Sequence, residues 1–157
     1  MNIQELGSLG EFVAAIATLV TLIYLALQIR QNTTSIRATT HHEVVSDITR
    51  GMEDLNRDPE LVRIWYDGVI DFDGLSRLEQ QRFATHGTAI VRRYENVLYQ
   101  INQGVLDPNA ITGIDEQMRY FFAQPGTKQW WVKARIFFGD QMRDYVESNL
   151  HALDKDA

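Results

Sequence analysis

This chain of 157 residues contains no cysteine. That absence excludes disulfide bonds, thiol catalysis, cysteine-ligated zinc and iron–sulfur clusters. Positive charge is also scarce, since 21 Asp and Glu stand against 15 Lys and Arg and the net charge is −6. No Lys/Arg-rich run appears anywhere in the chain, so the electrostatic footprint of a nucleic-acid-binding protein is missing. We therefore expect no nucleic-acid partner.

Motifs of known catalytic chemistry are missing as well. The chain has no GxSxG, no P-loop, no GxGxxG and no protein-kinase motif set. It also lacks HExxH and any Glu-x-x-His pair, which argues against zincin and di-iron carboxylate sites. We therefore expect no catalytic residue, no metal site and no cofactor, and we predict that the protein is not an enzyme.

The chain contains one long uncharged run, from Phe12 to Ile29, and Arg30 follows it directly. At about 1.5 Å rise per residue, its eighteen residues just span the hydrocarbon core of a bilayer. Acidic residues precede the run and no small-residue cleavage site follows it, so it does not fit a secretory signal. We predict an uncleaved transmembrane helix, with a short extracytoplasmic tail, within residues 1–29.

The charges beside this run predict its orientation. Arg30 and Arg37 flank its C-terminal end, whereas the N-terminal flank carries only acidic residues. By the positive-inside rule, the N-terminus lies outside and the rest of the chain lies in the cytoplasm. Membrane lipid is thus an expected partner.

Polar and small residues form a stripe along the predicted membrane helix. They recur at alternating steps of four and three: Gly10, Ala14, Ala17, Thr21, Tyr24 and Gln28. Small residues let helices approach closely in lipid, and Thr and Gln can hydrogen-bond across the contact. The stripe predicts self-association into a homo-oligomer. The alternative is an ion-conducting pore lined by Thr18, Thr21 and Gln28.

No Gly or Pro interrupts residues 11–50, so one helix is expected to run on from the membrane segment through residues 30–57, which we expect to form a juxtamembrane helix. A predicted seam follows the same spacing: Thr34, Ala38, His41, Val45, Ile48, Met52 and Leu55. Within an oligomer, a ring of His41 side chains could hold a metal ion, or form a polar layer, or simply be solvated. If His41 lies on an interchain seam, its protonation below neutral pH would bring like charges together near Arg37 and loosen the contact.

Residues 58–157 read as a cytoplasmic α-helical domain. Asp58-Pro59 and Asp107-Pro108 are helix starts, and Ser76 with Glu79 forms a capping box that opens a long helix. The long helix is expected to bury an apolar face of helical period: Phe83, Gly87, Ile90, Val91, Tyr94, Val97, Leu98 and Ile101. A last helix is expected to carry Trp130, Trp131, Ala134, Phe137, Phe138, Met142, Tyr145 and Val146. No segment alternates with period two, so the predicted fold is all-α: a transmembrane helix, a juxtamembrane helix and a helical bundle.

One charged cluster stands beside an apolar helix face, at Arg92, Arg93 and Glu95. It suggests either a site at which Arg92 or Arg93 holds a ligand carboxylate or lipid headgroup, or an ion pair with Glu95 inside the bundle.

Three stretches carry a family resemblance: LGEFVAAIATLVTLIYLALQIRQNT near the start, RRYENVLYQINQGVLD in the second half, and WWVKARIFFGDQMRDYV near the end. They resemble a large family of uncharacterised bacterial proteins with an N-terminal transmembrane helix and a helical cytoplasmic domain. The resemblance implies a bacterial origin and hence an inner-membrane location. It includes no catalytic motif.

Overall fold

The structure is a computed structural model that describes residues 3–153, and it is all-α, as the sequence predicts. No strand occurs in that range. The chain divides into two compact units, one ending at Thr39 and the other beginning at Thr40.

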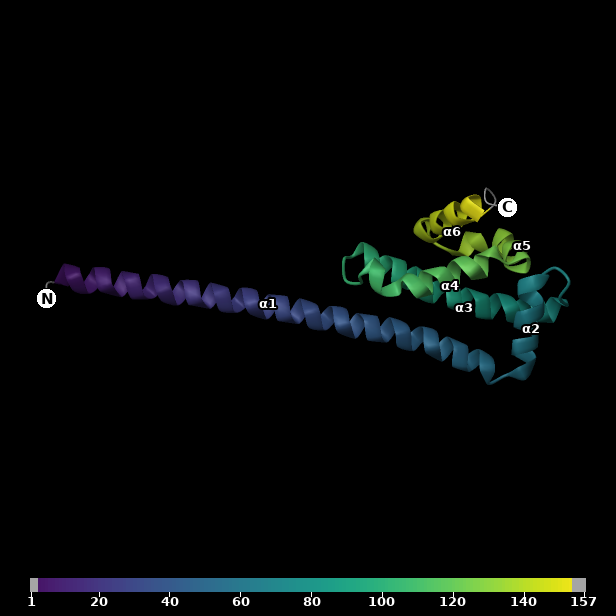
Figure 1. The fold of residues 1–157 in the computed structure, drawn as a ribbon, viewed down its shortest axis with the longest axis horizontal. Coiled ribbons are helices and arrows are strands. Elements are labelled where there is room, and N and C mark those ends of the chain that lie inside the picture. Colours follow the sequence, from purple (N-terminus) through teal and green to yellow (C-terminus); the bar gives the residue numbers. More distant parts are fainter. Residues whose placement is uncertain (1–2, 154–157) are drawn as a thin grey trace. The chain divides into compact units, whose positions relative to one another are not determined.

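Helix α1 runs from Ile3 to Asn56 without a break, which confirms the prediction of one continuous helix (Figure 1). No proline lies within it to remove a backbone hydrogen bond. In the first unit its large apolar side chains are exposed: Leu9, Phe12, Val13, Ile16, Leu19, Val20, Leu22, Ile23, Leu25, Leu27 and Ile29. This part of α1 is long and apolar enough to cross a membrane.

The next two helices begin where the sequence predicts. Helix α2 (Pro59–Ile70) is capped by Asp58, whose Oδ1 accepts from the backbone N–H of Glu60 at 3.0 Å. Helix α3 (Arg77–Asn102) opens with the expected capping box between Ser76 and Glu79. Each cap satisfies N–H groups that the first helical turn leaves without a partner.

The C-terminal half is divided more finely than the sequence suggests. A 3₁₀ turn precedes the helix expected after Asp107, and a second one separates the last two helices. The elements are η1 (Pro108–Ile111), α4 (Thr112–Ala123), α5 (Pro125–Ala134), η2 (Arg135–Phe137) and α6 (Asp140–Leu153).

The prediction of one last helix through Trp130 and Val146 is therefore wrong. Phe138 has an extended backbone (φ −109°, ψ 154°), which ends the helical run. The break lets the Phe138 ring stack on Trp131, with centroids 5.4 Å apart, and lets Gly139 N–H donate to Glu95. Tertiary contacts thus decide the break, because helical spacing holds on both sides of it.

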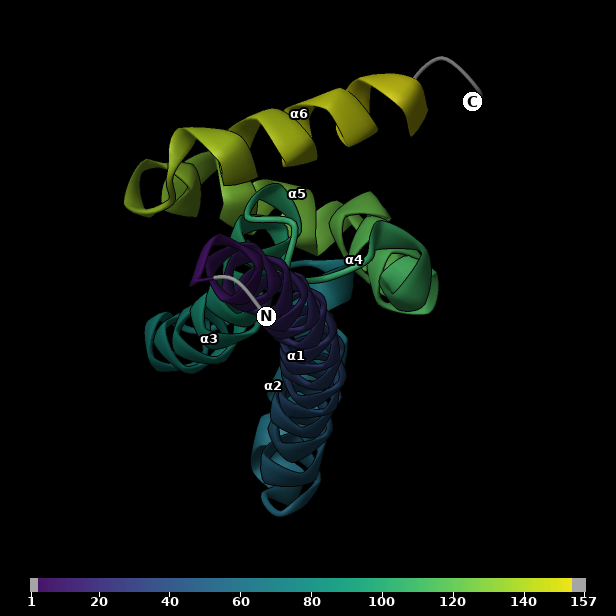
Figure 2. The ribbon, with the colours of Figure 1, turned by 90° about the vertical axis from the view of Figure 1, so that its left-hand side faces the viewer.

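Within the second unit, α6 lies on one side and α2 on the other, with α3, α4 and α5 between them (Figures 1 and 2). Helix α3 contacts α2, α5 and α6, so it is a central helix of the domain. Its buried residues are those of the apolar face that the sequence predicts: Phe83, Gly87, Val91, Tyr94 and Val97.

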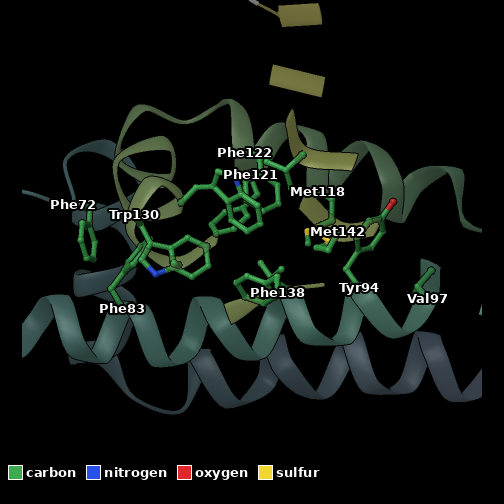
Figure 3. Close-up of a cluster of buried hydrophobic side chains, with 14 of the residues drawn as sticks. Phe72, Phe83, Tyr94, Val97, Met118, Phe121, Phe122, Trp130, Phe138 and Met142 are labelled. Atoms are coloured by element: carbon green, nitrogen blue, oxygen red, sulfur yellow. The ribbon is translucent and has the colours of Figure 1, made fainter. Parts of the chain in front are cut away.

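The core is largely aromatic (Figure 3). Trp65 stacks on Phe83 at 4.9 Å and on Phe121 at 5.2 Å between centroids, which joins α2, α3 and α4. Trp130 is 1 % exposed and packs edge-on against Phe83. Such rings bury a large apolar area each and dominate the stability of a small domain.

Helices α2 and α5 approach each other very closely at two glycines. A Cβ on Gly126 would lie 2.0 Å from the carbonyl oxygen of Gly68 and 2.8 Å from the backbone nitrogen of Phe72. A Cβ on Gly68 would lie 2.4 Å from the ring of Phe83. The crossing of α2 and α5 therefore needs a residue without a side chain at position 126, whereas Gly68 leaves room for the Phe83 ring of α3.

The end of α1 belongs to the domain, so the domain starts earlier than the residue 58 expected from the Asp-Pro signal. Its inward face consists of Thr40, Val44, Ile48, Gly51 and Leu55, all buried or half-buried. Of the predicted interchain seam, Ile48 and Leu55 share this inward face, whereas Val45 and Met52 are 40 % and 42 % exposed, and the seam stays a prediction. Packing on α3 thus buries a face of α1 that overlaps the predicted seam at Ile48 and Leu55 and is turned by roughly 60° from it.

Candidate functional site

The polar groups of the predicted membrane helix are hydrogen-bonded within that helix. The Thr18 and Thr21 hydroxyls donate to the carbonyl oxygens of Ala14 and Ala17 at 2.9 and 2.8 Å. Gln28 Nε2 donates to the hydroxyl of Tyr24 at 2.8 Å. Gly10 has open space around it. The stripe is thus exposed and internally bonded, and the pore alternative stays a prediction of the sequence.

The two adjacent histidines of α1 differ in exposure. His41 is half-buried, at the start of the second unit, and His42 is exposed. Among the described residues, no group of three His, Asp or Glu side chains is placed to hold a metal ion. The interchain seam at His41 stays a prediction.

In the cluster of Arg92, Arg93 and Glu95, the structure keeps Arg92 and Glu95 together and places Arg93 apart from them. Arg92 forms an ion pair with Glu95 at 2.5 Å and donates to the carbonyl oxygen of Phe137. Its guanidinium also lies over the Phe138 ring, 5.0 Å from the centroid. The other Glu95 oxygen accepts from Gly139 N–H at 2.8 Å. Arg92 and Glu95 therefore join α3 to the segment between η2 and α6.

Arg93 points instead toward α1. Its guanidinium lies against Gly51, where an added Cβ would be 2.4 Å from Nη1 and 3.1 Å from Cζ. Within the described residues, Arg93 makes no ion pair and no side-chain hydrogen bond. The neighbouring Asp47 and Asp54 pair with Arg50 and Arg57. Arg93 is thus a half-buried cation beside two engaged carboxylates.

Two cavities lie along the groove between the end of α1 and α3. One, of about 240 Å³, is lined by Val44, Asp47, Ile48, Arg92, Arg93, Asn96 and Val97. The other, of about 400 Å³, is lined by Asp54, Leu61, Gln81, Arg82, Thr85, His86, Ala89 and Arg93. Arg93 lines both cavities. We call this region, with its two cavities and Arg93, the α1–α3 groove.

His86 lines the larger cavity together with Asp54, Arg82 and Arg93. Burial, and then the charge of Arg93, lowers the pKa of His86, while Asp54 acts in the opposite direction. Its Nε2 atom is shielded from solvent and has no hydrogen-bond partner among the described residues. Trp65 lies edge-on to the imidazole, 5.1 Å away between centroids. Any change of charge beside Arg93 should therefore be felt at His86.

A second cluster, around Asp115, joins three helices inside the domain. Asp115 Oδ1 accepts hydrogen bonds from the hydroxyls of Tyr94 in α3 and Tyr145 in α6, the latter at 2.7 Å. Asp115 Oδ2 pairs with Arg119 at 2.8 Å. Burial opposes the charge of Asp115, but these hydrogen bonds outweigh it and hold its pKa below the ordinary value. Burial also raises the pKa of both tyrosines.

Sequence reasoning did not find this cluster, and it placed Tyr94 and Tyr145 only as apolar face residues. The available signal was chemical, since a buried tyrosine hydroxyl normally needs a hydrogen-bond partner. None of the cavities described above includes Asp115. The cluster is therefore a structural link, and the α1–α3 groove is the candidate site.

No protein-family model, curated protein or solved structure matches this chain.

Proposed function

We propose that the protein is a single-pass membrane protein that self-associates through the first part of α1 and holds a helical domain for assembly or partner binding at the cytoplasmic face. The observation that carries the proposal is the exposure of every large apolar side chain from Leu9 to Ile29. A continuous apolar surface of this length is unfavourable in water and favourable in lipid.

The hydrogen bonding of the same segment supports insertion. A helix satisfies its own backbone groups, and here the hydroxyls of Thr18 and Thr21 are satisfied by the helix too. Unsatisfied polar groups are what hydrocarbon penalises most strongly. The side chain of Gln28 finds its partner in Tyr24, near the end of the run.

Self-association rests on the stripe from Gly10 to Gln28. Gly10, Ala14 and Ala17 leave the helix backbone accessible on one side, which is the arrangement that lets two helices pack closely in a membrane. Ile48 of the predicted seam beyond residue 40 is partly buried and packs against the domain core, so the proposal uses the stripe alone.

Topology can be tested because the chain has no cysteine of its own. We would introduce single cysteines as Gly7→Cys and Leu78→Cys, both at exposed positions. Each variant would then be labelled in bacterial spheroplasts, which lack the outer membrane but keep the inner membrane sealed. A membrane-impermeant maleimide should label position 7 at once and position 78 only after lysis. The reverse pattern would contradict the orientation, and recovery of the protein in the soluble fraction would contradict the membrane location.

Assembly is tested by mass measurement of the full chain in detergent or lipid nanodiscs. Ala14→Leu with Thr21→Leu adds bulk to the stripe and should convert an oligomer to a monomer. Ala15→Leu with Ala26→Leu adds similar bulk to another side of the helix and should leave assembly unchanged. A monomeric wild type, or an oligomer that survives the first pair of substitutions, would refute self-association through this stripe.

A further inference from the structure

Arg93 lacks a counter-charge that comparable arginines of the domain possess. Arg82 pairs with Asp58 and Glu60, and Arg119 pairs with Asp115. For Arg93 the described residues supply no such partner, although the side chain is half-buried. Removing part of the hydration of a charge without compensation is unfavourable, so this position favours an anion from outside the chain.

The surroundings of Arg93 have room for such an anion. Cavities of about 240 and 400 Å³, both open to solvent, adjoin it on two sides. Asn96 in one cavity and Gln81 in the other add amide donors, while Val44, Ile48 and Leu61 supply apolar walls. A few polar groups within apolar walls are typical of small-molecule sites.

We propose that Arg93 binds an anionic group, a phosphate or a carboxylate, in the α1–α3 groove. A planar guanidinium with five donors fits both groups through paired hydrogen bonds. The bound group comes either from a free small anion or from the headgroup of an anionic lipid. All residues involved belong to the second unit, so the inference does not depend on membrane insertion.

Gly51 provides the sharpest test of this geometry. Its missing side chain leaves the space that the Arg93 guanidinium occupies, since a Cβ there would lie 2.4 Å from Nη1. The contacted atoms are the end of a flexible side chain, so Gly51→Ala displaces the guanidinium without displacing backbone. Alanine is also the better helix former. The substitution should therefore leave the fold intact and still weaken anion binding.

His86 gives a readout that needs no knowledge of the natural ligand. Its imidazole is near Arg93 of α3 and Asp54 of α1, and Arg82 lines the same cavity. An anion on Arg93 would offset the charge that disfavours imidazolium, so bound anion should shift the His86 titration midpoint to higher pH. By linkage, anion affinity should rise as the pH falls through that midpoint.

The experiment uses the full chain in nanodiscs of zwitterionic lipid and follows the His86 imidazole by NMR, with the signal assigned by its loss in His86→Gln. One arm adds inorganic phosphate against sodium chloride of equal ionic strength. The other replaces part of the lipid with phosphatidylglycerol. A saturable upward shift in the first arm identifies a free anion as the ligand, and a shift in the second arm alone identifies a lipid headgroup.

Three variants decide whether Arg93 is responsible. Arg93→Gln and Gly51→Ala should each weaken the apparent affinity at least tenfold. Arg77→Gln removes the same charge from the exposed start of α3 and should leave the affinity unchanged. Equal loss in Arg77→Gln and Arg93→Gln would overturn the proposal as a general charge effect. Unchanged binding in Gly51→Ala, or the absence of a saturable shift in both arms, would also overturn it.

Discussion

Asp115 shows how a single side chain holds distant parts of the domain together. Its carboxylate accepts from Tyr94 and Tyr145, which belong to helices far apart in the sequence, and pairs with Arg119 on its own helix. The two tyrosine rings also contact each other, with centroids 5.0 Å apart. Loss of the charge would leave two half-buried hydroxyls competing for a weaker acceptor.

This cluster gives the domain a defined acid sensitivity. Because the pKa of Asp115 is held below its ordinary value of 3.8, the cluster stabilises the fold fully above that pH. The stabilisation is lost as the pH falls through the lower, folded-state pKa. We expect Asp115→Asn to cost about 2 kcal/mol at neutral pH, and this difference from wild type should shrink below about pH 3.8.

The measurement is denaturant unfolding of the full chain in mild detergent, followed by tryptophan fluorescence at several pH values. Asp144→Asn removes a carboxylate from an exposed position of α6 and serves as the control. A difference between wild type and Asp115→Asn that stays constant with pH would show that the charge of Asp115 does not stabilise the fold.

Gly126 is the residue at which the smallest substitution should have the largest effect. Its would-be Cβ meets the backbone of α2 and of the following turn, at 2.0 Å from the Gly68 oxygen and 2.9 Å from Asp71 N, and backbone cannot rotate away. We expect Gly126→Ala to destabilise the domain by about 3 kcal/mol or more. Thermal unfolding compared with Gly113→Ala, a helical glycine with open space around it, measures the effect. Equal stability of the two variants would mean that α2 and α5 do not approach this closely.

At the scale of elements, α1 changes its surroundings along its length while its secondary structure stays the same. Its first part presents apolar side chains outward, and its last part buries Thr40, Val44 and Gly51 in the domain. Helix propensity and backbone hydrogen bonding do not distinguish these two regions. The two regions differ in the surroundings of their side chains, which are exposed in the first part and packed against the domain in the last part.

The register of α1 on the domain can be tested with two adjacent valines. Val44 is 4 % exposed and Val45 is 40 % exposed. Val44→Ala should cost about 1.5 kcal/mol through lost apolar burial, whereas Val45→Ala should be close to neutral. Both substitutions change helix propensity equally, so the difference in unfolding free energy between them reports packing alone. A larger cost at Val45 would contradict this register of α1 on the domain.

At the scale of the whole molecule, the two units differ in whether their apolar side chains are exposed or buried. The first unit has only exposed apolar side chains along its membrane-length segment, and the second has its own core centred on Trp130 and Phe83. A core of this kind needs no contribution from residues before Thr40. In the proposed topology, lipid therefore surrounds the first unit, and the domain should fold without it.

We expect a chain that begins at Thr40 to be water-soluble, helical and cooperatively folded. The full chain should instead remain with the membrane pellet after alkaline extraction. Circular dichroism and thermal melting of the shortened chain, together with membrane fractionation of the full chain, provide the test. A shortened chain that aggregates or stays unfolded would show that the first unit contributes to the folding of the domain.

Local signals in the sequence were sufficient for most of the secondary structure. The uncharged run and the absence of proline predicted a continuous α1, and the Asp58 and Ser76 caps predicted the starts of α2 and α3. These features work through contacts between residues a few positions apart, so they can be read directly from the order of residues. The apolar period of α3 likewise predicted its buried face, because a helix has only one face to bury.

Tertiary structure decided everything that depends on which surfaces meet. The break at Phe138 arises from stacking on Trp131, the buried face of α1 from packing on α3, and the closeness of α2 and α5 from Gly126. The candidate site belongs to this second class. Arg93 stood out in the sequence only as part of a charged cluster, and Gly51 did not stand out at all. Only their approach across two helices leaves a half-buried cation beside two cavities. Contacts between residues distant in the chain carry no local pattern, so they emerge only when the helices pack.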